Sequence, residues 1–102
     1  MTRQPYRLRV ADHAAVVLRS LHPNIKRKIR SALHAIIADP FTGKALGDEL
    51  SGLRSFRVSR FRIVYRLAQD KVIEIIAIGP RERIYEETYR LLQKAEKTDA
   101  LR

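Results

Sequence analysis

Cysteine and tryptophan are absent from the 102-residue sequence, and histidine occurs three times. Without cysteine, the chain can form no disulfide and has no thiolate for catalysis or metal binding. Three histidines at these spacings match no known metal-site pattern, so we expect neither a metal ion nor another cofactor. Long apolar runs are also missing. This argues against a secretory signal or a membrane-spanning helix, and a cytoplasmic protein without membrane contact is the default expectation.

Acidic residues are scarce relative to basic ones. The chain has 21 lysines and arginines against 11 aspartates and glutamates, a net charge of +10. Residues 1–38 contain eight basic side chains and one acidic side chain, Asp12, whereas residues 81–102 are nearly balanced. A large, clustered positive charge favours a polyanionic partner, with nucleic acid as the first candidate and an acidic protein as the second. The length suits one domain, residues 1–102.

Five arginines gather between residues 54 and 66, a stretch without a carboxylate. Arginine on a rigid strand suits phosphate binding, because its planar guanidinium donates two hydrogen bonds in fixed geometry. Alternation along the stretch predicts a strand with an apolar face and a mainly cationic face, namely Phe61, Ile63, Tyr65 and Leu67 against Arg60, Arg62, Val64 and Arg66. An ordinary solvated sheet face is the alternative interpretation.

Local patterns predict an α+β domain with the order βααβββα. The sequence indicates a strand at 6–10, a helix from a capping Asp12 to Leu21, a helix at 24–38, a loop at 39–53, strands at 54–59, 61–68 and 71–78, and a helix at 83–97. We expect a small antiparallel sheet, with the strands 61–68 and 71–78 adjacent. The helical hairpin 12–38 should pack on one face of this sheet, and a C-terminal helix should follow it.

Several segments follow one another in a recognisable order. An initial strand and a helical hairpin ending in Asp39-Pro40 precede Leu50-Ser51-Gly52, Phe56-Arg57-Val58, Phe61-Arg62-Ile63-Val64-Tyr65 and Ile78-Gly79-Pro80-Arg81-Glu82-Arg83-Ile84-Tyr85. Together they resemble the RelE/ParE superfamily of toxins from type II toxin–antitoxin pairs, over almost the whole chain. The resemblance implies the RelE-like α+β fold and a cognate antitoxin that holds the toxin inactive.

The RelE-like branch implies a set of catalytic residues. Arg62 stands at the strand arginine that contacts the scissile phosphate, and Arg57 at a basic position on the neighbouring strand. Arg81 stands at the arginine after the last long strand. Tyr85 lies near the family's C-terminal tyrosine, although closer to Arg81 than usual. Ser55 falls where some relatives carry a second lysine, which removes one candidate for proton transfer.

The proton-transfer group is less well defined than the cations. Arginine holds its proton too tightly to act as an acid or a base, so Tyr85 is the main candidate. Packing of Tyr85 in the core is the alternative for this residue. Tyr65 alternates with apolar residues and is expected in the core. The carboxylates Glu49, Glu82 and Glu86 are further candidates, and the remaining arginines expected to bind RNA are Arg54, Arg60, Arg66 and Arg83.

Three functions remain open from the sequence. The first is a metal-independent endoribonuclease toxin that cleaves messenger RNA, in association with the ribosome, and inhibits translation. The second is a ParE-like toxin that binds DNA gyrase without being an enzyme. The third is a basic nucleic-acid-binding module without toxicity. The joint presence of Arg62, Arg81 and Tyr85 favours the first, with an acidic antitoxin as partner in a hetero-oligomer.

Overall fold

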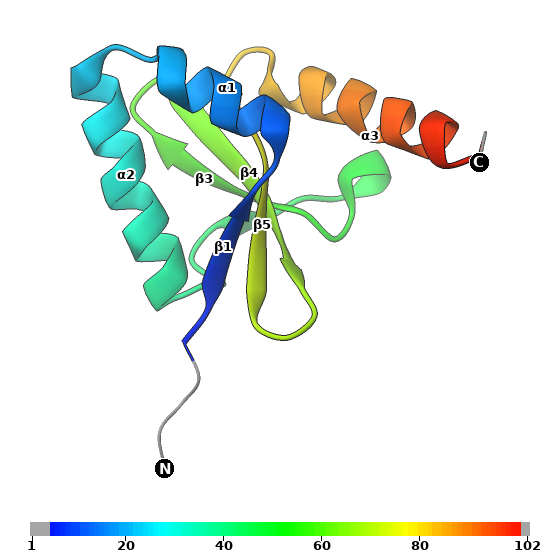
Figure 1. The fold of residues 1–102 in the computed structure, drawn as a ribbon, viewed down its shortest axis with the longest axis horizontal. Helices are drawn as coiled ribbons and strands as arrows, with labels where there is room; N and C mark the ends of the chain where they lie inside the picture. Colours follow the sequence, from blue (N-terminus) through cyan, green and yellow to red (C-terminus); the bar gives the residue numbers. More distant parts are fainter. Residues whose placement is uncertain (1–4, 101–102) are drawn as a thin grey trace.

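The computed structural model describes residues 5–100, with side chains up to residue 95. Its elements are β1 (Arg7–Val10), α1 (Asp12–Ser20), α2 (Pro23–Ala38), β2 (Lys44–Ala45), the short 3-10 helix η1 (Asp48–Leu50), β3 (Arg54–Val58), β4 (Phe61–Ala68), β5 (Val72–Pro80) and α3 (Ile84–Ala100) (Figure 1). The predicted α+β class and the order of its main elements are confirmed. Within the described range, no helix has the length and apolarity needed to cross a membrane.

Five strands form one sheet in the order β1-β5-β4-β3-β2. The strands β4 and β5 are adjacent and antiparallel, as predicted, and β3 pairs antiparallel with β4. The expectation of a wholly antiparallel sheet is wrong at one edge, because β1 pairs in parallel with β5. Parallel neighbours need a long crossover connection. Residues 11–71, which join β1 to β5, supply it.

Each face of the sheet has its own apolar cluster. The helices α1 and α2 cover one face, where Ala14, Ile29, Leu33 and Ile36 pack with Ile63, Tyr65, Ile73 and Ile75. The other face is covered by α3, where Ile84 packs with Leu53, Val64 and Ala77. The predicted alternation in β4 is therefore confirmed. Burying each large aliphatic side chain contributes about 1.5–3 kcal/mol, so both clusters support the position of the strands.

The starts of the two N-terminal helices differ from the prediction. Asp12 is the first residue of α1, and the N-cap is Ala11, which makes no side-chain cap. The prediction that Asp12 caps the helix is thus wrong, although its carboxylate still lies in the first turn, where negative charge is favourable. Before α2, the Nδ1 atom of His22 accepts a hydrogen bond from the backbone N–H of Asn24 at 3.2 Å. Pro23 then occupies the first turn, where proline is well tolerated.

The predicted loop 39–53 contains β2 and η1 and is tied to the sheet through Tyr65. This side chain is fully buried, and its hydroxyl donates to the carbonyl of Pro40 at 2.8 Å and accepts from the N–H of Gly43 at 3.0 Å. A Cβ atom on Gly43 would lie 2.5 Å from the Tyr65 hydroxyl oxygen. Tyr65 is therefore in the core, as its alternation with apolar residues predicts, and from there it also anchors the loop.

Candidate active site

Arg57 and Arg62 occupy opposed positions on neighbouring strands. The register pairs Arg57 of β3 with Arg62 of β4, close to the turn formed by Ser59 and Arg60. The exposed Arg57 donates from Nε to the carbonyl of Ser59 at 3.3 Å. Among the described residues, neither arginine forms an ion pair with a carboxylate. Like charges directly opposite one another destabilise a sheet, so this end of the sheet is suited to an anion.

Arg62 and Tyr85 meet at the buried hydroxyl of Ser55. Arg62 donates from Nη1 to Ser55 Oγ at 3.1 Å, and the Tyr85 hydroxyl forms a 3.2 Å hydrogen bond with the same oxygen. The guanidinium carbon of Arg62 lies 5.9 Å from the centre of the Tyr85 ring, within the range of a cation–π contact. A phenol and a guanidinium, 23 residues apart in sequence, are thus held side by side.

The first turn of α3 brings Tyr85 to the sheet. Gly79 at the end of β5 faces Arg62 across the strands. A Cβ atom on Gly79 would lie 3.0 Å from Cδ1 of the fully buried Ile84, so the absence of a side chain allows α3 to begin close to the sheet. Tyr85 also touches the apolar cluster beneath α3. The ring of Tyr85 therefore packs under α3, while its hydroxyl reaches Ser55.

Arg81 follows β5 at the same end of the sheet. Its backbone N–H donates to the carbonyl of Arg60 at 2.9 Å, which places it beside the β3–β4 turn. Its side chain is 47% exposed and forms only a loose ion pair with Glu82, 3.8 Å from Nε to Oε1. The structure thus gathers the backbone positions of Arg57, Arg60, Arg62 and Arg81 at one end of the sheet.

The other arginines expected to bind RNA have different surroundings. Arg60 and Arg83 are exposed, in the turns that flank the candidate site. Arg54 instead donates to the backbone carbonyls of Gly43 at 3.1 Å and Phe41 at 3.0 Å, and it stacks 5.4 Å from the Phe41 ring. Arg54 therefore holds the 41–43 segment, and the structure does not bring it to Arg62.

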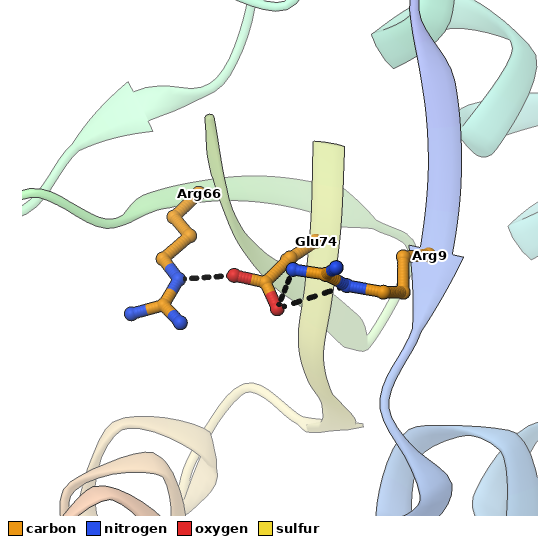
Figure 2. Close-up of polar contacts among 3 residues, drawn as sticks. All are labelled: Arg9, Arg66 and Glu74. Atoms are coloured by element: carbon orange, nitrogen blue, oxygen red, sulfur yellow. Dashed lines mark hydrogen bonds and ion pairs between the residues drawn. The ribbon is translucent and has the colours of Figure 1, made fainter. Parts of the chain in front are cut away.

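Arg66 belongs to a separate ionic cluster, shown in Figure 2. Arg66 Nε lies 2.6 Å from Glu74 Oε1, and Arg9 Nη2 lies 2.7 Å from Glu74 Oε2. Burial tends to raise the pKa of Glu74, but the hydrogen bonds and charges of Arg66 and Arg9 outweigh it and hold this pKa below its ordinary value. The carboxylate bridges β1, β5 and β4, so Arg66 has a structural partner already.

Ser55 is the site residue that the sequence analysis missed. The sequence indicates only that Ser55 replaces a lysine found in some relatives. In the structure Ser55 is 1% exposed, and its side chain contacts both Arg62 and Tyr85. One signal was available in the sequence: Ser55 and Arg57 are two residues apart on a strand and must share a face.

The comparisons with known proteins match this fold. The model of the family described as "ParE toxin of type II toxin-antitoxin system, parDE" matches residues 8–85. The chain belongs to this toxin family. It is therefore the toxin of a type II toxin–antitoxin system within the RelE/ParE superfamily. No curated protein matches its sequence significantly.

Solved structures of toxins share the fold. A chain of the toxin–antitoxin complex RelBE2 from Mycobacterium tuberculosis is 28% identical with a TM-score of 0.68, and the match covers 76% of the toxin described here and 100% of that chain. A double mutant of the E. coli toxin RelE in the free state is 23% identical with a TM-score of 0.70, covering 90% and 98%. A chain of the archaeal RelE–RelB complex from Pyrococcus horikoshii is 24% identical with a TM-score of 0.64, covering 78% and 99%.

Proposed function

We propose that this toxin is an endoribonuclease that cleaves messenger RNA by using the 2′-hydroxyl of its substrate as the nucleophile. One observation carries the proposal: a tyrosine hydroxyl and an arginine guanidinium converge on Ser55, and a second arginine stands directly opposite. Phosphate binding requires the guanidinium groups, and proton transfer requires the phenol. A surface that only binds phosphate has no need for the phenol.

The proposed reaction assigns a role to each group. The 2′-oxygen attacks phosphorus as its proton leaves, the bond to the 5′-oxygen breaks, and the departing 5′-oxygen takes up a proton. Arg57, Arg62 and Arg81 stabilise the charge that develops on the phosphorane oxygens. Tyr85 supplies the proton to the 5′-oxygen. The products carry a 2′,3′-cyclic phosphate and a 5′-hydroxyl.

Glu82 is the proposed acceptor of the 2′-hydroxyl proton. Of the three carboxylates that the sequence offers, Glu86 is bound by Arg90 at 2.6 Å, and Glu49 lies in η1. Glu82 directly follows Arg81, and its side chain is 66% exposed, so it can approach a substrate at the end of the sheet.

A cognate antitoxin is the proposed protein partner. The structures of relatives include complexes of RelE with RelB and of YoeB with YefM. An acidic antitoxin segment would neutralise the exposed cations around Arg57 and Arg81, either by lying in a groove or by adding a strand to the sheet. The ribosome is the proposed place of cleavage, where exposed basic side chains would contact RNA phosphates.

The deciding experiment compares the parent toxin with Arg62→Ala during a brief induction. Primer extension on messenger RNA should reveal new 5′ ends with the parent and none with the variant at equal protein levels. Arg90→Ala is the matched control, because it removes an exposed arginine from α3 and should leave cleavage unchanged. Cleavage should also continue in the presence of a chelator that removes transition metals and leaves the ribosomal magnesium in place, since the chain supplies the positive charge. Growth arrest by the parent with intact messenger RNA would refute the proposal.

Inhibition of DNA gyrase is the second candidate function, and the match to the ParE family model favours it. The same samples therefore enter a supercoiling assay with purified gyrase. Loss of supercoiling in the presence of the parent toxin, together with intact messenger RNA, would establish this candidate in place of the first.

A further inference from the structure

We infer that Ser55 is a positioning residue that couples Arg62 to Tyr85, so that the cation and the proton carrier act as one unit. The inference deepens the proposed function and rests on it for the catalytic consequence. Ser55 Oγ makes both hydrogen bonds, 3.1 Å to Arg62 Nη1 and 3.2 Å to the Tyr85 hydroxyl. The side chain is 1% exposed, so Ser55 is covered from a substrate and acts through its two partners.

The donor and acceptor capacities of the three groups fix part of the arrangement. Guanidinium N–H groups only donate, so Ser55 Oγ accepts from Arg62, whereas a serine hydroxyl also has one hydrogen to give. Towards Tyr85 it can therefore accept from the neutral phenol or donate to the phenolate by rotating its hydroxyl. The phenol has a single hydrogen, so Tyr85 turns it towards the substrate for transfer while Ser55 donates its own hydrogen to the phenol oxygen, and the contact persists through the reaction.

The position of Ser55 explains how side chains from two separate elements are aligned. Arg62 is a long side chain on β4, and Tyr85 belongs to the first turn of α3, while Ser55 is on β3 with Lys44 of β2 on one side and Val64 of β4 on the other. Its short side chain has little freedom, so the oxygen is fixed by the sheet. Misplacing a catalytic group by about 1 Å can lower a rate about 100-fold, and a single fixed oxygen constrains both groups.

The first test measures this geometry in the purified toxin without any substrate. We compare the parent, Ser55→Ala and Thr88→Val by NMR, using tyrosine labelled with ¹³C at Cζ and the ¹⁵N signals of arginine side chains. Thr88→Val is the matched control, because it removes another buried hydroxyl, which donates to the carbonyl of Ile84 at 2.6 Å in the same helix as Tyr85. Ser55→Ala should move both the Tyr85 and Arg62 signals, and Thr88→Val should move neither comparably. Unmoved signals in a folded Ser55→Ala protein would overturn the inference.

The second test measures cleavage of a short messenger RNA bound to purified ribosomes, the proposed place of cleavage. Ser55→Ala should lower kcat about 10- to 100-fold, the range seen when a supporting partner of a catalytic group is removed, while KM stays near the parental value. Ser55→Thr keeps a hydroxyl on the same carbon and should restore most of kcat. A normal kcat in folded Ser55→Ala, or a higher KM with unchanged kcat, would contradict a positioning role. If the parent cleaves no RNA, the ribonuclease proposal fails, and the NMR comparison alone still decides whether Ser55 couples the two side chains.

Discussion

Arg57 and Arg62 face each other across β3 and β4, and neither has a carboxylate partner among the described residues. Opposed like charges weaken a sheet by roughly 0.2–1 kcal/mol. We therefore expect Arg57→Gln to raise the free energy of unfolding by a few tenths of a kcal/mol in low-phosphate buffer. The same change should slow RNA cleavage, because one donor to the phosphorane is lost.

Added phosphate provides the check on that prediction. An anion that binds only the folded protein stabilises it by mass action, so phosphate should raise the melting temperature of the parent more than that of Arg57→Gln. Thermal unfolding with and without phosphate, at constant ionic strength, measures both effects. Equal phosphate responses would show that the opposed arginines do not form an anion site.

Tyr85→Phe separates proton transfer from packing. The ring is retained, so the apolar cluster beneath α3 should persist and the melting temperature should change little. Loss of the hydroxyl should slow RNA cleavage by about 10²–10⁴-fold, the usual contribution of a positioned acid or base. Single-turnover cleavage rates test this. A parental cleavage rate in Tyr85→Phe would show that the tyrosine hydroxyl takes no part in the reaction.

Gly43→Ala should destabilise the fold. The added Cβ atom would lie 2.5 Å from the Tyr65 hydroxyl oxygen and 3.0 Å from the backbone oxygen of Ser55, and neither buried neighbour can move freely. Overpacking of this kind costs about 1–3 kcal/mol. Urea unfolding measures the loss, with Gly47→Ala as the control, because a Cβ atom there meets nothing within 4 Å. Equal stability of the two variants would show that the loop does not depend on this close approach.

Glu74→Gln should lower stability at neutral pH by about 1 kcal/mol, because its partners are half exposed and such pairs are partly screened by solvent. The pKa of Glu74 is held below its ordinary value in the folded protein, so the ionised carboxylate stabilises the fold above the unfolded-state pKa, about 4.3 for glutamate. The difference between parent and variant should disappear as pH falls through the lower, folded-state pKa.

Unfolding curves at pH 7 and at successively lower pH values follow that difference. Glu86→Gln is the matched control, since it breaks an exposed pair with Arg90 within α3, and such pairs contribute only about 0.3–0.5 kcal/mol. A constant difference between parent and Glu74→Gln down to the lowest pH would refute the assigned role of the ionised carboxylate.

Antitoxin binding should weaken with salt. The proposed docking surface includes the exposed side chains of Arg57 and Arg81. Interactions between exposed charges are largely screened beyond about 8 Å at physiological ionic strength, and this distance shortens as salt is added. Titration calorimetry at low and high salt should therefore show a clear loss of affinity for the parent and a smaller loss for Arg57→Gln. An affinity that is independent of salt would place the antitoxin elsewhere.

The sequence was sufficient to predict the helices and strands whose residue patterns lie within the element itself. Helical spacing identified α2 through Ile29, Leu33 and Ile36, and alternation placed Ile63 and Val64 on opposite faces of β4. The parallel pairing of β1 with β5 could not be predicted in the same way, because it joins segments more than 60 residues apart. Pairing between distant segments leaves no periodic signal in either segment.

The candidate site was predicted in part. Family resemblance assigned Arg57 and Arg62 to neighbouring strands, and the structure places them opposite each other. Arg54 and Arg66 show why residue type alone does not identify the site. Two backbone carbonyls already bind the guanidinium of Arg54, and Glu74 binds that of Arg66. Ser55 was missed because a serine becomes informative only once its two neighbours are known.

The place of β5 in the sheet also constrains when this fold can be completed during synthesis of the chain. β5 lies between β1 and β4, yet it is the last strand to leave the ribosome. Before it emerges, β1 has no neighbour to pair with, and Arg81 and Tyr85, which follow β5 in the sequence, have not emerged either. A product terminated before β5 therefore lacks the candidate site, and the sheet can be completed only after β5 has been made.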